Sequence, residues 1–512
     1  TKEAEKYYYH RISFVNPEGV EVWQWQNDKL VSQIMTASLA EEYYGLRFAG
    51  QALDVDPAYE PAQVVFASLA LEKGFERAGI DQPLENGAPG VKDLLRVVSP
   101  VLLIDTLDRA LSDSRLPVIL GAARTLGDLG EVRALRPKAR QEPALLRALN
   151  FPDRRVQLAA ADAILRIPNP EPYRLSARVV EVLRRFCAAD AKPRVIVADG
   201  NKRRGDELAK IVQMAGYETE VRTTGAEVLQ RLNEAADVDA LLVTVDAGQK
   251  LLPANPPFPG RQAPVPQVIG PANSIQHSLP EPGLPSFLAQ LRSDINFGLL
   301  PTIILVAHDQ AGTIPAEFEA DLRRLTENYR NVWVAPAKTD MEGLKQMLQE
   351  RIIQAMVKPL SEAERKANAA TATLWLKRLA VGEVPGYDVR PAEKAILNAL
   401  HSPEIAPLAI EAAGKLPGAN AQRELAKVVL DDTPAPPLRA AAALELAHHI
   451  QKNSLVLTQE IKAIEELYGT VEDPKLKGNL ALVLGSFHPA RQLTGLRLKD
   501  YKPPVPAPAK EK

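Results

Sequence analysis

"RALSDSRLPVILGAARTL" (residues 109–126) and "RALNFPDRRVQLAAADAIL" (147–165) are two stretches of the sequence that align with each other. Val118 falls over Val156, and Leu126 falls over Ile164. Each stretch contains the end of a Leu-rich helix, a polar turn, and a second helix with small residues beside its apolar stripe. A helical pair that recurs in this way predicts a stack of helices, because each pair buries its apolar face against the next.

The same pattern returns three times in the last third of the chain, at 399–416, 429–446 and 470–487. Each copy has a proline at or just before the start of its second helix, where the missing amide donor costs nothing. We therefore expect two arrays of helical repeats, at 91–190 and 361–495. The aligned leucines are Leu408, Leu438 and Leu476, and the prolines, with one from the first array, are Pro117, Pro407, Pro437 and Pro474.

These helical pairs resemble HEAT-type α-solenoid repeats, including the arginine after the turn, which is Arg155 in the first array and Arg439 in the second. The resemblance covers roughly residues 91–187 and 366–490. It implies an extended surface of stacked helices that binds other macromolecules.

The first 90 residues have a different pattern. The segment 11–26, "RISFVNPEGVEVWQWQ", has turn residues at 16–19 between two strand-like runs, which predicts a hairpin that turns there. From Asp28 onward we expect helical periodicity, with a first helix that ends before Pro57. The stretch 40–74 resembles the second helix of a tetratricopeptide repeat followed by the first helix of the next. Residues 1–90 are thus expected to form a hairpin or cap followed by these helices.

Between the two arrays, strands and helices alternate. Strand-like runs begin at Pro193, Tyr217, Asp239, Thr302 and Asn331, and helical runs separate them. Such alternation predicts a doubly wound parallel sheet with right-handed crossovers, in a domain at 191–360. The fold class is thus expected to be mostly α with an α/β insertion. The order and lengths of these elements resemble a response-regulator receiver domain with an insertion after the third strand.

The insertion, residues 247–300, is rich in proline and is expected to be a long loop. Two proline pairs in it, Pro256 with Pro259 and Pro282 with Pro285, have the PxxP spacing that an SH3-like reader recognises. The tail at 496–512 also contains many prolines and is expected to be disordered.

The receiver resemblance implies a phosphoryl-accepting aspartate after the third strand and paired acidic residues that hold Mg²⁺ after the first. This chain has Asp199 after the first strand, but Gly200 follows it where a second metal-binding carboxylate is expected. Thr244 occupies the acceptor position, and Asp246 lies two residues later on the same face of the strand. The charge of an acyl phosphate would therefore be poorly compensated.

The remaining receiver positions are altered as well. Ala307 stands where the resemblance implies a hydroxyl residue, and Ala335 stands where it implies a lysine, so that only the following Pro336 is retained. We interpret the domain as a pseudo-receiver, with a degenerate pocket formed by Asp199, Thr244, Asp246, His308, Asp309 and Pro336.

The carboxyl edge of the predicted sheet is the alternative location for chemistry, because open α/β sheets bind ligands there. Carboxylates and an imidazole in that place suit a divalent metal or acid–base catalysis. Polar residues also commonly follow strands for structural reasons, so we favour a structural role for these side chains. We expect no catalytic residue, resident metal or cofactor. Mg²⁺ is expected only in the signalling alternative. The residues concerned are Asp199, Asp246, His308 and Asp309.

The composition excludes other classes. Lys+Arg 62 against Asp+Glu 64 gives a formal charge of -2, so nucleic acid is not an expected partner. The single cysteine, Cys187, cannot form an internal disulfide and is expected to be a small buried hydrophobe. His10 is expected to be isolated, and His448 and His449 to form a solvated helix end. No apolar run approaches the roughly 18 residues of a membrane span.

A cytoplasmic location is favoured. Because the sequence starts with Thr1 and not with methionine, removal of a leader peptide is an open alternative. The primary hypothesis is a non-enzymatic scaffold or adaptor that binds protein partners through its helical repeats and pseudo-receiver. The first alternative is a signalling protein whose receiver-like domain still binds a metal or phosphoryl ligand. The second is a metal-assisted enzyme at the same sheet edge.

Overall fold

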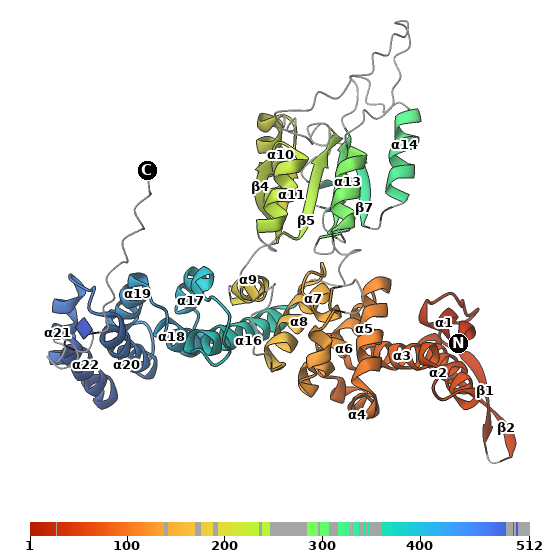
Figure 1. Cartoon of the computed structure of the whole chain (residues 1–512), viewed down its shortest axis with the longest axis horizontal. Coiled ribbons are helices and arrows are strands. Elements are labelled where there is room, and N and C mark those ends of the chain that lie inside the picture. Colours follow the sequence, from red (N-terminus) through yellow and green to blue (C-terminus); the bar gives the residue numbers. More distant parts are fainter. Residues whose placement is uncertain are drawn as a thin grey trace, which may run out of the picture. The chain divides into compact units, whose positions relative to one another are not determined.

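A computed structural model of the chain consists mostly of helices, with an inserted five-stranded parallel sheet (Figure 1). This confirms the expected fold class. The chain divides into two compact units, one made of Thr1–Val182 and Asp190–Glu364 and the other of Leu183–Ala189 and Arg365–Lys512. The structure describes residues 1–26, 28–137, 142–168, 176–187, 193–234, 238–245, 284–294, 297–298, 300–306, 316–327, 329, 331–336, 342–343, 346–347, 350, 360–487, 495 and 498–499.

Helices form most of the N-terminal part of the first unit. They are α1 (Lys2–Tyr8), α2 (Ala37–Val55), α3 (Glu60–Ala78), α4 (Pro89–Val97), α5 (Pro100–Asp113), α6 (Leu116–Leu129), α7 (Ala144–Ala148) and α8 (Arg154–Arg166), followed by α9 (Ser176–Cys187), which ends in the second unit.

The expected helical pairs of the first array are present. α5 packs against α6, α7 packs against α8, and α6 packs against α8. Pro100 is the first residue of α5, where Ser99 caps the helix by accepting from the backbone N–H of Val101. Asp153 caps α8 in the same way, by accepting from the N–H of Arg155 at 2.7 Å. Local capping chemistry therefore fixes the starts of α5 and α8.

The N-terminal hairpin exists, but the prediction of its turn is wrong. Strand β1 (Val20–Gln26) pairs antiparallel with β2 (Lys29–Met35), so both strands follow the expected turn at 16–19. The expected helical periodicity from Asp28 is wrong for the same reason. Asp28 has a φ of 59°, which aspartate tolerates in a tight turn. The residues at 16–19 form a turn at the base of the hairpin, where the N–H of Ala37 donates to the carbonyl of Pro17 at 2.7 Å.

The parallel sheet has the strand order β4-β3-β5-β6-β7, one of the common doubly wound arrangements. Helices cover both faces. One apolar layer, which includes Ile196 and Leu241, packs against α11 and α13, and the other, which includes Val197 and Leu242, packs against α10. The elements are β3 (Arg194–Ala198), α10 (Lys202–Met214), β4 (Glu218–Arg222), α11 (Gly225–Glu234), β5 (Ala240–Thr244), α13 (Leu284–Ser293), β6 (Thr302–Val306), α14 (Ala316–Glu327) and β7 (Val332–Pro336).

The Pro-rich segment is not a loop throughout, as the sequence analysis expected. Helix α13 lies inside it and contributes the buried side chains of Phe287, Leu288 and Leu291 to the sheet core. The parallel pairing of β5 with β6 requires a crossover on one face of the sheet, and α13 belongs to that crossover. Pro285 of the second PxxP pair lies in α13, whereas Pro256, Pro259, Pro282 and the tail at 500–512 lie outside the described residues.

The second unit contains the three helical pairs of the second array, and their presence is confirmed. α18 packs against α20 and α20 against α22, while α17 packs against α19 and α19 against α21, so the pairs stack in two rows (Figure 1). The helices are α16 (Glu362–Val381, which begins in the first unit), α17 (Glu393–Ala399), α18 (Ala406–Ala413), α19 (Ala419–Leu430), α20 (Pro436–Asn453), α21 (Glu460–Thr470) and α22 (Pro474–Ser486).

The arginine after the turn has a visible structural role in this unit. The Nε of Arg439, on α20, donates to the carbonyl of Val429 at 3.0 Å, and its Nη1 lies 2.8 Å from the carboxylate of Asp432. Arg439 is buried, so these contacts fasten the start of one helix to the end of its partner.

Candidate functional site

Asp199 directly follows β3, and its side chain is fully buried. Asn201 caps α10 by accepting from the backbone N–H groups of Arg203 and Arg204. This cap starts α10 close to the end of β3 and brings the Arg204 side chain to Asp199. Arg204 Nε donates to one carboxylate oxygen at 2.6 Å, and Nη2 donates to the other at 2.7 Å. The backbone N–H of Asn201 adds a third hydrogen bond to Asp199 at 2.8 Å.

The Arg204–Asp199 pair changes what this edge of the sheet can do. A bidentate guanidinium uses both carboxylate oxygens and neutralises their charge. A metal ion at Asp199 would therefore have to displace a cation that the protein itself supplies. Within the described residues, no cluster of histidine, cysteine, aspartate and glutamate could hold a metal ion.

The other predicted pocket residues are only partly described. Thr244 is the last residue of β5, is buried, and donates its hydroxyl to the carbonyl of Ala198 at 3.3 Å on the adjacent strand. The structure thus brings Thr244 and Asp199 to the same edge of the sheet. Pro336 ends β7, and its side chain is not described. Asp246, His308 and Asp309 lie outside the described residues.

A groove between α17 and α19 is a second candidate site, which the sequence analysis did not identify. Its volume is about 520 Å³. The spacing of three and four residues places four side chains of each helix on the face toward the groove. The lining residues are Glu393, Lys394, Leu397, Asn398, Asn420, Arg423, Glu424 and Lys427.

The groove is polar, and its lining carries three cations and two carboxylates. Lys427 lies 2.7 Å from Glu424, so those two charges compensate each other. Lys394 and Arg423 are exposed and form no ion pair with any described residue. Leu397 is buried and supplies the apolar part of the lining. Such a groove can bind an elongated polar ligand that brings negative charge.

A network of charged side chains in the N-terminal helices is a third feature that sequence reasoning missed. His10, expected to be isolated, has Nδ1 3.0 Å from Glu41 of α2 and Nε2 3.7 Å from Glu72 of α3. Glu41 also accepts from Lys73 at 2.8 Å, and Glu72 accepts from Arg115 at 3.2 Å. The carboxylates of Glu72 and Glu41 raise the pKa of His10 above its ordinary value.

The interior of this network contains Tyr8, whose side chain is fully buried. Among the described residues its hydroxyl has no hydrogen-bond partner. The guanidinium groups of Arg109 and Arg115 each lie 5.1 Å from the centre of its ring, and burial raises its pKa well above the usual range. A histidine between two carboxylates can exchange protons. Here His10 already binds carboxylates from two helices, so the contacts fasten the residues after α1 to α2 and α3.

The expected environment is found for Cys187 but not for His449. Cys187 is buried, as expected, and its thiol accepts from the Thr373 hydroxyl at 3.4 Å while burial raises its pKa. The expectation of a solvated end at His449 is wrong. His449 is buried in α20 and donates from Nε2 to the carbonyl of Leu416 at 2.7 Å. It faces the helical stack because α20 continues to Asn453, beyond the histidine pair.

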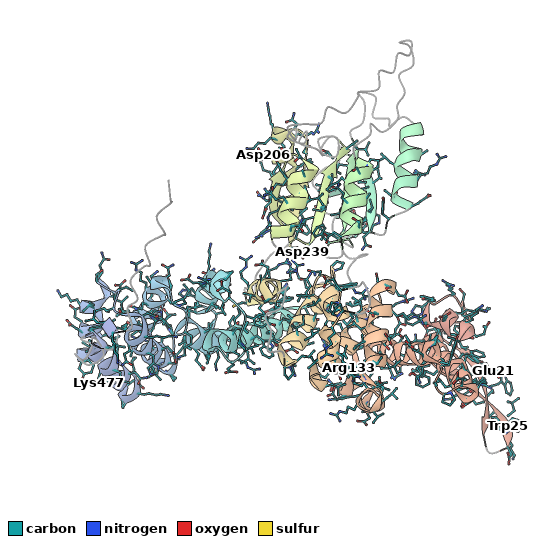
Figure 2. All side chains as sticks on the ribbon, viewed as in Figure 1. Glu21, Trp25, Arg133, Asp206, Asp239 and Lys477 are labelled. Carbon is teal, nitrogen blue, oxygen red and sulfur yellow. The ribbon has the colours of Figure 1, made fainter. Side chains whose placement is uncertain are left out.

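Comparison with known proteins does not place the chain in a family, since no family model, curated protein or solved structure matches it. In the described part of the chain, the helices are too short or too polar to cross a membrane. A function therefore has to be inferred from the geometry of the sites above. Figure 2 shows the side chains of the described residues, with Asp239 at the sheet and Lys477 in the second array labelled.

Proposed function

We propose that this protein is a non-enzymatic scaffold or adaptor, and that the α17–α19 groove binds an extended, acidic segment of a protein partner. The groove carries the proposal, because it runs between neighbouring helices of a stack and contains two cations, Lys394 and Arg423, that form no ion pair with any described residue. Stacked helical repeats expose long surfaces without a closed pocket, which is the geometry that binding of an extended chain requires. We infer that these pairs are HEAT-type repeats and that α2 and α3 are tetratricopeptide-like.

The lining of the groove supports a polypeptide ligand. Asn398 and Asn420 can each donate and accept hydrogen bonds at the same time, as a peptide group of the ligand also does. Lys394 and Arg423 would pair with acidic side chains of the ligand. Leu397 offers an apolar contact that limits the solvent around these pairs.

We further propose that the sheet domain is a pseudo-receiver that acts as an additional docking face. Its strand order and the position of Asp199 support a receiver-like origin. The Arg204 guanidinium on Asp199 and the threonine at position 244 argue against phosphoryl chemistry. The signalling alternative requires a metal ion to replace Arg204 and is therefore the weaker proposal.

Selection of peptides tests the groove. Random peptides displayed on phage are selected on the immobilised full chain, and the enriched sequences are synthesised. We expect them to contain Asp or Glu and to bind Arg423→Glu at least tenfold more weakly, because the new carboxylate repels the ligand. Lys475→Glu, which reverses an exposed cation at the start of α22, is the matched control and should leave binding unchanged.

Two results would contradict the proposal. Enriched peptides that bind Arg423→Glu as tightly as the unchanged protein would place the binding surface outside the groove. Enriched peptides that are basic would contradict the role of Lys394 and Arg423. Circular dichroism of both variants establishes that the helical content is retained.

A further inference from the structure

The hairpin of β1 and β2 has one free apolar face. The cross-strand register places Trp23 opposite Ser32, Trp25 opposite Leu30, and Glu21 opposite Ile34, so all six side chains share one face. The apolar members are far more exposed than large hydrophobic side chains usually are. Their exposed fractions are 48% for Trp23, 70% for Trp25, 58% for Leu30 and 74% for Ile34, and these four residues are called the hairpin face below.

The opposite side of the hairpin attaches it to the rest of the chain. Val22 points to that side and is fully buried. β1 contacts α2, and the hydrogen bond from Ala37 to Pro17 holds the base of the hairpin. Trp25 lies toward the outer end of the hairpin (Figure 2). The hairpin face is therefore not the surface by which the hairpin packs on its own helices.

An isolated two-stranded hairpin is at best marginally stable in water, and a further apolar layer stabilises it. The hairpin face offers that layer a substantial area. Large side chains bury about 150–250 Å² each, so the exposed parts of these four amount to roughly 500 Å². Contiguous apolar patches of this size mark interaction sites on soluble proteins.

We propose that the hairpin face packs against the same face of a second copy of this chain. Two such faces bury roughly 1,000 Å² together, which reaches the lower end of specific interfaces and predicts a weak, reversible dimer. A two-fold axis makes this contact closed, because each copy uses the same surface. Two twisted β-layers that pack face to face are also a common way to bury apolar strands.

The charges on the hairpin favour an antiparallel arrangement of the two copies. Glu21, near the base, is the only charged residue among the six that share the face, whereas Lys29 lies on the opposite face with Val22 and Gln33. Antiparallel packing keeps the two Glu21 carboxylates at opposite ends of the interface. Parallel packing would bring the two Glu21 carboxylates together, which costs free energy.

The test compares two lysine substitutions at adjacent positions of β2. Ile34→Lys places a charge on the hairpin face, and Gln33→Lys places the same charge on the opposite face at an exposed position. Sedimentation equilibrium of the full chain over a wide concentration range measures the dimer constant. We expect a concentration-dependent dimer whose dissociation constant rises more than tenfold in Ile34→Lys and less than twofold in Gln33→Lys.

Three results would overturn the proposal. The first is a chain that stays monomeric at the highest soluble concentration. The second is an equal weakening by both variants, which indicates pairing through the strand edge. The third is a monomer that co-sediments with phosphatidylserine vesicles in an Ile34-dependent way, which assigns the hairpin face to a lipid surface. Far-UV circular dichroism and the unfolding temperature show for each variant that the fold is retained.

Discussion

Arg204 and Asp199 form a bidentate ion pair in which the Asp199 side chain is completely buried and the Arg204 side chain is 42% exposed. The pair lies at the carboxyl end of β3, where doubly wound sheets commonly bind their ligands. The protein thus places its own cation at this edge of the sheet. This arrangement favours a structural role for Asp199.

Removal of Arg204 is expected to destabilise the first unit. Among the described residues, Arg204→Ala leaves the buried carboxylate of Asp199 with the N–H of Asn201 as its one donor, and the loss of charge-assisted hydrogen bonds costs about 1–3 kcal/mol of unfolding free energy. Urea titration of the full chain, followed by circular dichroism, measures it. Arg203→Ala is the control, because Arg203 is exposed and its ion pair is with the exposed Glu207. Equal effects of the two variants would contradict the structural role of the Arg204–Asp199 pair.

The same pair predicts that the sheet domain does not respond to a phosphoryl mimic. The unfolding temperature of the full chain should be unchanged by Mg²⁺ with beryllofluoride, because a ligand raises it only by binding the folded state. Differential scanning fluorimetry measures the shift. A rise that Asp199→Ala abolishes would instead support the signalling function.

Helix α6 approaches α8 so closely that Gly127 is required at their contact. A Cβ at position 127 would lie 2.6 Å from the Cα and 2.8 Å from the Cβ of Ala163. Gly127→Ala should therefore lower the unfolding free energy by about 1–3 kcal/mol, since overpacking outweighs the gain in helix propensity of about 1 kcal/mol.

Gly478→Ala is the matched control for this prediction. Gly478 also lies inside a helix, α22, but a Cβ there meets no atom within 4 Å. The control should stabilise the protein slightly, by up to about 1 kcal/mol. Urea titrations of both variants measure the difference, and a stabilising Gly127→Ala would show that α6 and α8 can separate without cost.

The contacts of His10 predict a loss of stability at alkaline pH. Glu41 and Glu72 face His10 from α2 and α3 and raise its folded-state pKa. The ion pairs of protonated His10 therefore stabilise the folded protein fully below the unfolded-state pKa of about 6.5. This stabilisation is lost as the pH rises through the raised folded-state pKa. The unfolding temperature of the unchanged protein should exceed that of His10→Asn by a few degrees near pH 5.5, and by less near pH 8.5.

Asparagine suits this test because His10 has a φ of 51°, a left-handed conformation that asparagine tolerates. The variant therefore removes the titrating group without a large backbone cost. A difference in unfolding temperature that is the same at both pH values would mean that the ion pairs of His10 contribute nothing to stability.

The buried His449 should lower the stability of the folded protein at acidic pH, whereas His10 affects stability at alkaline pH. Burial lowers the pKa of His449, so the folded protein holds it neutral while the unfolded chain takes up a proton below about pH 6.5. Its contribution is present above that value and is lost as the pH falls, at a limiting slope of about 1.4 kcal/mol per pH unit. Urea titrations at several pH values should show a weaker acid dependence for His449→Gln than for the unchanged protein. An unchanged acid dependence would contradict this assignment.

Much of the fold could be predicted from the sequence because it depends on local chemistry. Helical periodicity, polar turns and prolines at helix starts predicted α5, α6, α8, α20 and α22, and β-branched runs predicted the strands of the sheet. The prediction failed where two local signals competed. The turn residues at 16–19 predicted a hairpin turn there, although the strands pair around Asp28. The many prolines before residue 284 predicted a loop where α13 lies.

The candidate sites depended far more on tertiary structure. The strand pattern was enough to predict that Asp199 follows a buried strand and that Thr244 ends another, and the helical pattern that small residues line the paired helices. The ion pair of Arg204 with Asp199, the position of His10 between two glutamates from different helices, and the groove between α17 and α19 could be seen only in the folded chain. The physical reason is that periodicity and capping act between residues within a turn or two, whereas ion pairs and grooves arise between elements that only packing brings together.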